Sequence, residues 1–404
     1  MNNIRVESPN CNNLIENLPK RSRFIAKCIN LYEDENRFAE VRFAQDTIVN
    51  WVPKIFFVRS MADFSEMTFL EFAENILVYY GGTFLYNKIF SKIFLKKLAP
   101  ELKEKISLSA TELLKNKNSA ATKKLIPLKA ALAVCGLAIP IAEFSLNYIK
   151  NLLTLKMFRQ ADFNNIANLN KNKRESFQKQ EKVKKSAINH LKLAGGLLAG
   201  AIGFATLLAT KGKNSKVLQA ASEFILTPGS KLFKNSPAKA AGINKYFGLD
   251  SSKLCRGMLT ACVIAAGFGY TGAAKDRGKQ NFLEVVFRLP LVLFYVVTGS
   301  EMFEKAYKHI LRKRGKCTEL LEAEAQNPEK QMPKLKELGE LATKLAAKNN
   351  TSVEHEFKKL LRQKMTIIGI PLGFSLLFMG FFVAAYSRYF TQYRYDRDAK
   401  RHNS

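Results

Sequence analysis

Uncharged apolar blocks alternate with lysine-rich blocks along most of this chain. Crossing the hydrocarbon core of a bilayer takes about 17–25 residues of apolar helix. Three blocks of that length carry no charged residue, and three more contain one or two. The uncharged blocks are residues 193–210, 257–274 and 366–386, and the others are residues 68–87, 130–149 and 281–300. The pattern predicts an all-α, polytopic membrane protein with five or six apolar helices joined by basic helical loops.

The same alternation sets the expected domains. The four segments are a neutral N-terminal helical cap (1–67), a membrane helical region with basic loops (68–300), a polar helical region (301–365), and a C-terminal transmembrane helix with a basic tail (366–404). Short apolar blocks also occur as buried helices of large soluble proteins, and that architecture is the alternative. No basic segment followed by an apolar core opens the chain, so no cleaved signal peptide is expected.

Charge adds an expectation about partners. The chain of 404 residues carries a formal net charge of +30. Residues 1–66 are neutral, with nine basic and nine acidic residues, whereas residues 150–192 hold eleven basic and three acidic ones. Such basic segments favour anionic membrane lipids, with partner membrane proteins or a second copy as further candidates. Nucleic acid is disfavoured, because the basic run 171–185 offers one aromatic side chain for stacking on bases. Since all later loops are basic, the positive-inside rule does not fix the orientation.

Motifs for catalysis and cofactor binding are absent from the sequence. No Walker loop, GxSxG or HExxH pattern occurs. The six cysteines form no CxxC pair, and the four histidines are scattered through polar blocks. We therefore expect no catalytic residue, no metal site and no cofactor, and a non-enzymatic role is favoured over an enzyme.

Ionisable residues inside the apolar blocks are the candidate functional residues. Glu143 lies in block 130–149, three residues after Pro140. We expect Pro140 to kink its helix and Glu143 to use the polar opening that a kink creates, because a carboxylate within a span is costly unless it is paired or hydrated. The alternative places Glu143 near the interface, where it reaches water.

Three further ionisable residues extend this candidate site. Glu71 and Glu74 lie three residues apart on one helical face, and Arg288 precedes Pro290. One of these carboxylates is expected to pair with Arg288, or all three anchor their helices at interfaces. Residues 139–146 are echoed by residues 370–376, and the sequence leaves open whether this echo is a true internal repeat or chance.

Small residues indicate where helices pack closely. One row follows a four-residue spacing within block 257–274, and a GxxxG step lies in block 193–210. The row consists of Gly257, Ala261, Ala265 and Gly269, and the step consists of Gly196 and Gly200. Small residues let backbones approach closely where lipid supplies no hydrophobic drive between helices. We therefore expect the two blocks to pack against each other.

The sequence favours one role and leaves a second open. The favoured role is a non-enzymatic scaffold or interaction component whose basic faces contact anionic lipid or protein partners. The alternative is a secondary transporter or channel with an ionisable site around Glu143. Transport requires the ionisable residues to converge inside the bundle, whereas a scaffold leaves them at the interfaces.

Overall fold

Helices account for almost all of the described chain. The computed structural model describes residues 11–403 except 35–36, 82–83, 85–91, 94–95, 97, 107, 117–118, 171–174, 250–255 and 328–330. The described residues are 86% helical and contain no strand. Within them, five helices are long and apolar enough to cross a membrane: Ala120–Phe158, Phe177–Asn214, Arg256–Arg277, Lys279–Lys313 and Val353–Arg401. The all-helical prediction is confirmed, and the number of long apolar helices falls within the expected range.

The sixth apolar block is only partly described. Its first half forms the end of helix α5 (Met61–Asn75) and the π-helical segment η3 (Ile76–Gly81). Residues 82–83 and 85–87 of the block lie outside the described residues. In the described part, α5 is not among the five long apolar helices.

The helices divide into two compact units. The cap unit comprises Met1–Val49 and Thr298–Met379, and the bundle unit comprises Asn50–Val297 and Gly380–Ser404. The expected N-terminal cap and the expected polar region 301–365 therefore contribute mostly to one unit, although they are far apart in the sequence.

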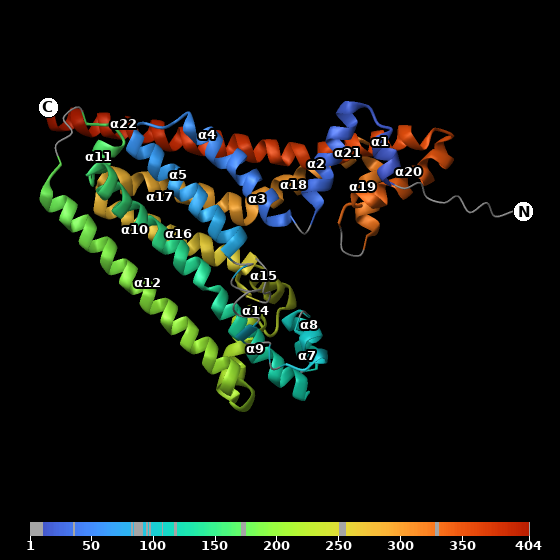
Figure 1. The fold of residues 1–404 in the computed structure, drawn as a ribbon, viewed down its shortest axis with the longest axis horizontal. Coiled ribbons are helices and arrows are strands. Elements are labelled where there is room, and N and C mark those ends of the chain that lie inside the picture. The colour runs from blue at the N-terminus through green and yellow to red at the C-terminus, as the bar shows by residue number, and fades with distance from the viewer. Residues whose placement is uncertain are drawn as a thin grey trace, which may run out of the picture. The chain divides into compact units, whose positions relative to one another are not determined.

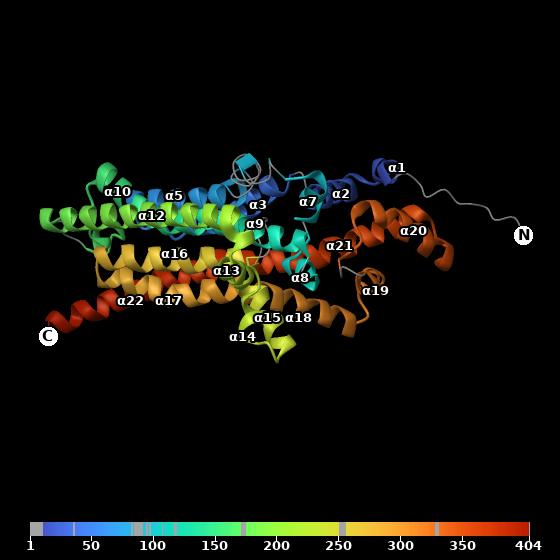
Figure 2. The same ribbon diagram turned by 90° about the horizontal axis from the view of Figure 1, so that it is seen from below.

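The bundle unit contains the candidate site. Its helices, after α5 and η3, are α4 (Val52–Ile55), α7 (Pro100–Lys105), α8 (Ala110–Lys115), α9 (Ala120–Gly136), α10 (Ala138–Phe158), α11 (Phe163–Ile166), α12 (Phe177–Lys211), η5 (Gly212–Asn214), α13 (Lys216–Leu226), α14 (Pro228–Leu232), α15 (Pro237–Phe247), α16 (Arg256–Arg277), α17 (Lys279–Phe294) and α22 (Val383–Asn403). Helix α10 packs against α5, α12 and α16, and α16 packs in turn against α17 (Figure 1 and Figure 2). Helix α22 packs on α17. Helix α10 therefore has neighbours on several sides, and its polar side chains face other helices.

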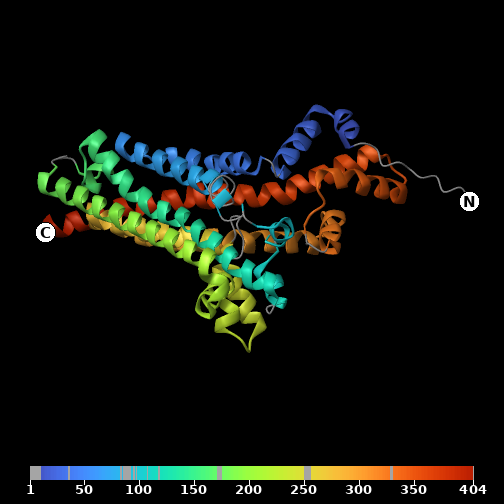
Figure 3. The same ribbon diagram turned by 60° about the horizontal axis from the view of Figure 1, so that its bottom comes forward.

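A second apolar core surrounds α9. Helix α9 packs against α12 and α13 (Figure 3). Its residues Leu125 to Cys135 are all buried. The buried Lys129 ammonium donates hydrogen bonds to the carbonyl oxygens of Ile106 (3.2 Å) and Leu108 (2.8 Å). These carbonyls follow α7 and lack helical partners of their own, so the lysine is satisfied inside an apolar core.

The cap unit is built on a helical hairpin. Its helices are α1 (Cys11–Glu16), α2 (Lys20–Glu33), α3 (Phe38–Asp46), α18 (Ser300–Lys313), α19 (Thr318–Gln326), α20 (Leu335–Asn349) and α21 (Val353–Ser375). Asn350 adopts a left-handed conformation that ends α20, and Ser352 caps α21 by accepting from the His355 amide. The hairpin packs Leu338, Phe357 and Leu361 into one core with the N-terminal helices.

Each passage of the chain between the two units lies in a π-helical segment. The segments are η2 (Thr47–Trp51), η6 (Tyr295–Gly299) and η7 (Leu376–Phe382), and each contains a unit boundary. Segments η6 and η7 begin five residues after Pro290 and Pro371, respectively, which both lie inside their helices. Proline removes an amide donor, and a π-helical turn accommodates the resulting mismatch in the hydrogen-bond ladder.

The helical segment 120–158 is interrupted at Leu137, because α9 ends at Gly136 and α10 begins at Ala138. Leu137 keeps a right-handed helical backbone conformation. Pro140 has no amide hydrogen to donate to the carbonyl of Gly136, so the interruption lies where the missing donor would place it. The kink expected at Pro140 stays a prediction. Pro371 lies inside α21, so the two halves of the sequence echo occupy different structural positions.

The small residues of α16 face helix α10. A β-carbon at Gly269 would lie 2.5 Å from the carbonyl oxygen of Phe144, which leaves no room for a side chain. At Gly196 and Gly200 of α12, by contrast, a β-carbon would meet nothing within 4 Å. Gly269 therefore packs against α10, whereas a β-carbon at Gly257 would lie 2.1 Å from the carbonyl oxygen of Gly248. The GxxxG step of α12 does not form the expected pair with this row. The buried face of α12 carries Ala194, Ala205 and Leu208 instead.

This close approach predicts that Gly269→Leu destabilises the protein. A leucine must separate the backbones of α16 and α10, and overpacking of this kind costs about 1–3 kcal/mol. Ile264→Leu is the control, because Ile264 is exposed on the same helix. Thermal unfolding of both variants in detergent measures the effect, and equal melting temperatures would show that the row is not a contact surface.

Candidate functional site

Helix α5 presents four carboxylates to the inside of the bundle unit. Ser60 caps the helix by accepting a hydrogen bond from the Asp63 amide at 3.1 Å. The four carboxylates belong to Asp63, Glu66, Glu71 and Glu74. At 3.6 residues per turn they fall within an arc of about 140°. One face of α5 is therefore acidic for most of its length, and each carboxylate requires a partner from a neighbouring helix.

The first cluster joins Asp63 to helices α17 and α22. Arg59 contacts Asp63 at 3.3 Å and Glu284 at 3.1 Å. Arg388 closes the ring, at 3.2 Å from Asp63 and 3.1 Å from Glu284. Two carboxylates and two guanidinium groups therefore form a closed, neutral arrangement in which each charge contacts two opposite charges.

The second cluster surrounds Glu66. The fully buried guanidinium of Arg277 donates to both carboxylate oxygens of Glu66, at 2.8 and 2.5 Å. The Thr154 hydroxyl donates to the same carboxylate at 2.6 Å, and Lys150 lies 3.8 Å away. Bidentate pairing by arginine is the strongest of the common charge-assisted contacts. Glu66 therefore links α5 to α10 and to the end of α16.

The third cluster contains three of the residues that the sequence singled out. Glu71 pairs with Lys54, and Glu74 accepts a hydrogen bond from the Tyr270 hydroxyl at 2.7 Å. The guanidinium of Arg288 lies 5.5 Å from the centroid of the Tyr270 ring. The structure therefore brings Glu74 and Arg288 to opposite sides of one tyrosine, and Lys54 takes the place of Arg288 as the partner of Glu71.

Glu143 belongs to a file of buried polar side chains on α10. Glu143, Asn147 and Asn151 follow a four-residue spacing and so occupy one helical face. We call these three residues the polar file. Glu143 is 3% exposed, and Asn147 and Asn151 are fully buried. Helix α10 packs against α5, the helix that carries Glu74, so the polar file lies on a direct neighbour of that helix.

Several atoms of the polar file have no hydrogen-bond partner among the described residues. They are Oε1 of Glu143, both side-chain polar atoms of Asn147, and Oδ1 of Asn151. Asn151 uses its amide nitrogen to donate to the Ala273 carbonyl at 3.2 Å. Buried polar groups are almost always satisfied, and leaving one unsatisfied costs roughly 1–3 kcal/mol. The polar file therefore holds four buried polar atoms without a partner among the described residues.

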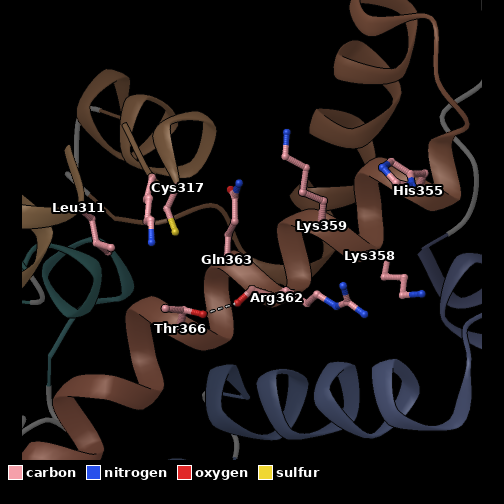
Figure 4. A pocket seen from close by; sticks show the side chains of 9 residues that line it. Leu311, Cys317, His355, Lys358, Lys359, Arg362, Gln363 and Thr366 are labelled. Carbon is pink, nitrogen blue, oxygen red and sulfur yellow. Dashed lines mark hydrogen bonds between the residues drawn. The ribbon is translucent and has the colours of Figure 1, made fainter. Parts of the chain in front are cut away.

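A separate basic pocket lies within the cap unit. It has a volume of about 480 Å³ and is lined by residues of α21 and of the loop before α19, with Lys316, Lys358, Lys359 and Arg362 among them. Lys359 and Gln363 extend from one side of α21, and Arg362 and Lys358 from another (Figure 4). Both Lys359 and Gln363 donate to Glu319, at 2.7 and 3.0 Å. One lysine of the pocket is therefore already paired within the protein.

Comparisons with known proteins add no assignment. The chain matches no protein-family model, no curated protein and no solved structure. In the described residues, no group of three or more His, Cys, Asp or Glu side chains is placed to hold a metal ion.

Sequence reasoning identified only part of this site. It found Glu71, Glu74, Glu143 and Arg288, because a charge stands out inside an apolar block. It missed the carboxylates Asp63 and Glu66, which lie in the neutral N-terminal segment, where charges are common. The four-residue spacing of Glu143, Asn147 and Asn151 was a detectable signal, since it repeats on one face of a helix.

Arg277→Met tests how strongly the second cluster stabilises the bundle. The substitution leaves the Glu66 carboxylate buried without its bidentate partner, and breaking a buried pair costs about 3–5 kcal/mol. Lys279→Met is the matched control, because Lys279 is 74% exposed and its pair with Asp398 lies at the surface. Such surface pairs contribute at most about 1 kcal/mol. Chemical unfolding in detergent measures both variants, and an equal loss would contradict a stabilising core.

The pH dependence of stability tests the contact between Glu319 and Lys359. Burial opposes ionisation of Glu319, but hydrogen bonds from Lys359 and Gln363 outweigh it and lower the pKa of Glu319 to about 2. The unfolded chain titrates near the ordinary glutamate pKa of about 4.3. The carboxylate therefore stabilises the folded state above that pH, and this contribution declines as the pH falls toward 2.

Glu319→Gln removes this titration. We expect the wild-type chain to exceed the variant in stability at pH 6, and the difference to shrink at pH 3. Unfolding midpoints at the two pH values provide the measurement. A difference that is the same at both would show that Glu319 does not titrate with a lowered pKa in the folded protein.

Proposed function

We propose that this chain is a multi-pass membrane protein that conducts or exchanges a proton or a small monovalent cation along the polar file of α10. The proposal rests on one observation: Glu143 and Asn147 are buried between helices, yet four polar atoms of the file lack partners among the described residues. The five long apolar helices supply the membrane setting.

The chemistry of the file favours a proton or a monovalent cation. Glu143 is a buried carboxylate, and a buried carboxylate is stabilised by a proton or by a bound cation. Tyr270 donates to Glu74, and Arg288 lies over the tyrosine ring, so the charge of Glu74 is held in place. The asparagine amides of the file offer both donors and acceptors to a hydrated ion.

The file leads from Glu143 toward the ion pairs of the second cluster. Asn151 is adjacent to Lys150, which approaches Glu66, and Thr154 follows one turn later and donates to the same carboxylate. Proton relays in membrane proteins are built from such chains of ionisable and polar side chains. The second cluster therefore continues the proposed path inside the bundle, and Glu143 is the proposed binding residue.

Glu143→Gln is the decisive variant. Glutamine keeps the size and hydrogen-bonding capacity of the side chain but carries no charge and does not exchange a proton. The full chain is reconstituted in vesicles that contain a pH-sensitive dye, and the vesicles are washed with alkaline carbonate to remove peripheral protein. We expect the wild-type chain to collapse an imposed gradient and Glu143→Gln to slow the collapse at least about tenfold, as for loss of a catalytic proton-transfer group.

Controls separate the ions and the roles. Glu101→Gln alters an exposed carboxylate on α7 and should leave the rate unchanged. Collapse of a pH gradient without sodium or potassium identifies a proton, whereas collapse only with one of these ions identifies the cation. Rates for Glu143→Gln equal to wild type, or wild-type rates equal to those of empty vesicles, would contradict ion passage.

A second candidate role is the interaction component that the charge pattern favours. The observation that supports it is the basic pocket of the cap unit together with the lysine-rich segments between the apolar helices. Anionic lipid head groups are the ligands that such segments attract. An inactive wild-type chain in the vesicle assay would leave this role as the better account.

A further inference from the structure

An open apolar groove lies in the bundle unit, away from the polar file. It is bounded by α12 on one side and by α13, α14 and α15 on the other, and its volume is about 860 Å³. All fourteen residues that line it are apolar, with glycine and proline included. Ligand sites in proteins have volumes of roughly 300–1,000 Å³, so the groove is large enough for a bound molecule.

The GxxxG step of α12 opens this groove. Gly196 and Gly200 line it, and a β-carbon at either position would meet nothing within 4 Å. Leu197 on α12 and Phe247 on α15 also line the groove, and these side chains are 53% and 52% exposed. The small residues that the sequence marked for helix packing therefore leave space instead of filling it.

The groove lies within one of the uncharged apolar blocks. Its α12 residues fall between positions 196 and 204, and the block covers residues 193–210. Inside a bilayer the surrounding medium is acyl chain, so an apolar groove by itself gives no preference for one lipid over another. Any selectivity must come from polar groups beside the groove.

Lysines supply those polar groups. Residues 211–249, which form the far wall, contain seven lysines and one acidic residue. The lysines alternate with the lining residues: Lys231 and Lys234 flank the lining residue Leu232, and Lys245 lies between Ile243 and Phe247. Short helices with an apolar face and a lysine-rich face are suited to the head-group region of a membrane.

We propose that this groove binds one acyl chain of an anionic phospholipid, whose phosphate contacts the lysines of α15 and Lys234, which lies between α14 and α15. The apolar wall accepts the chain, and the excess of lysine selects the negative head group over a zwitterionic one. This gives a site and a ligand class to the lipid contact named above as the second role, and it does not depend on ion passage through the polar file.

The experiment fills the groove without disturbing the fold. Gly200→Leu places a side chain in the groove, where the structure leaves room for it. Gly195→Leu is the matched control, because Gly195 also has nothing within 4 Å and does not line the groove. Both variants make the same exchange in the same helix, so any general effect of leucine on α12 appears in both.

Native mass spectrometry of the full chain in a neutral detergent measures bound lipid. Equal amounts of phosphatidylglycerol and phosphatidylcholine are added. We expect wild type and Gly195→Leu to retain one phosphatidylglycerol per chain. The lipid-bound fraction of Gly200→Leu should be about tenfold lower. Replacing Lys234, Lys239 and Lys245 together with glutamine should lower the preference for phosphatidylglycerol by at least about tenfold, since each lysine near an anionic head group contributes.

Each other result overturns the proposal. Equal retention of the two lipids by wild type would show an unselective apolar surface. Equal retention by Gly200→Leu and wild type would place the lipid elsewhere. A wild-type dimer that becomes monomeric in the Gly200→Leu variant would identify a second copy of the chain as the occupant of the groove. The vesicle assay of Glu143→Gln reads ion passage and is independent of these outcomes.

Discussion

Four carboxylates on one face of α5 are the constraint on which the bundle unit depends. A buried carboxylate is costly unless a cation and hydrogen bonds compensate its charge. The compensating groups come from separate helices: Arg277 from α16, Arg388 from α22, and Lys150 from α10. Each of these helices must therefore approach α5 with a particular rotation, and a different arrangement would leave a charge buried and unpaired.

These pairings act together with close packing of the backbones. Gly269 lets α16 lie against Phe144 of α10, and Arg277 on the same helix reaches Glu66 two turns later. Apolar contact between helices is non-directional, so it does not by itself fix how one helix is rotated against another. Ion pairs set the register of the helices, and small residues set how closely they approach.

Part of this architecture follows from the sequence. Block lengths and flanking lysines predicted the long apolar helices, because the thickness of a bilayer fixes the length that a span requires. Charges within those blocks identified Glu143, Glu74 and Arg288 as candidates. The structure places Glu74 at the hydroxyl of Tyr270 and Arg288 over its ring, and Glu143 lies on the neighbouring helix α10. The ion-pair partners of these residues could not be predicted from the sequence. Lys54 and Glu71, for example, are seventeen residues apart, and only the tertiary fold brings them together.

Two features show what the sequence leaves open. The helical segment around Pro140 is interrupted at Leu137, where the missing amide donor of Pro140 leaves the Gly136 carbonyl without its helical partner. Gly196 and Gly200 were expected to pack against α16, yet they line the groove beside α13 to α15. A proline or a small residue only limits which structures are possible at its position. Whether the result is a helix kink, a helix start, a close helix contact or an open groove depends on the neighbouring element.

The polar file is the central element of the functional account, and access of water to Asn147 is its most direct test. In a full-length chain whose six cysteines are replaced, Asn147→Cys is treated with a small, water-soluble thiol reagent in intact vesicles. Ala131→Cys, in the apolar core of α9, is the reference for a buried position without polar neighbours. The account predicts that Asn147→Cys is modified and that Ala131→Cys is not. Equal protection of both would show that the file is closed to water, and would contradict a route for ions through α10.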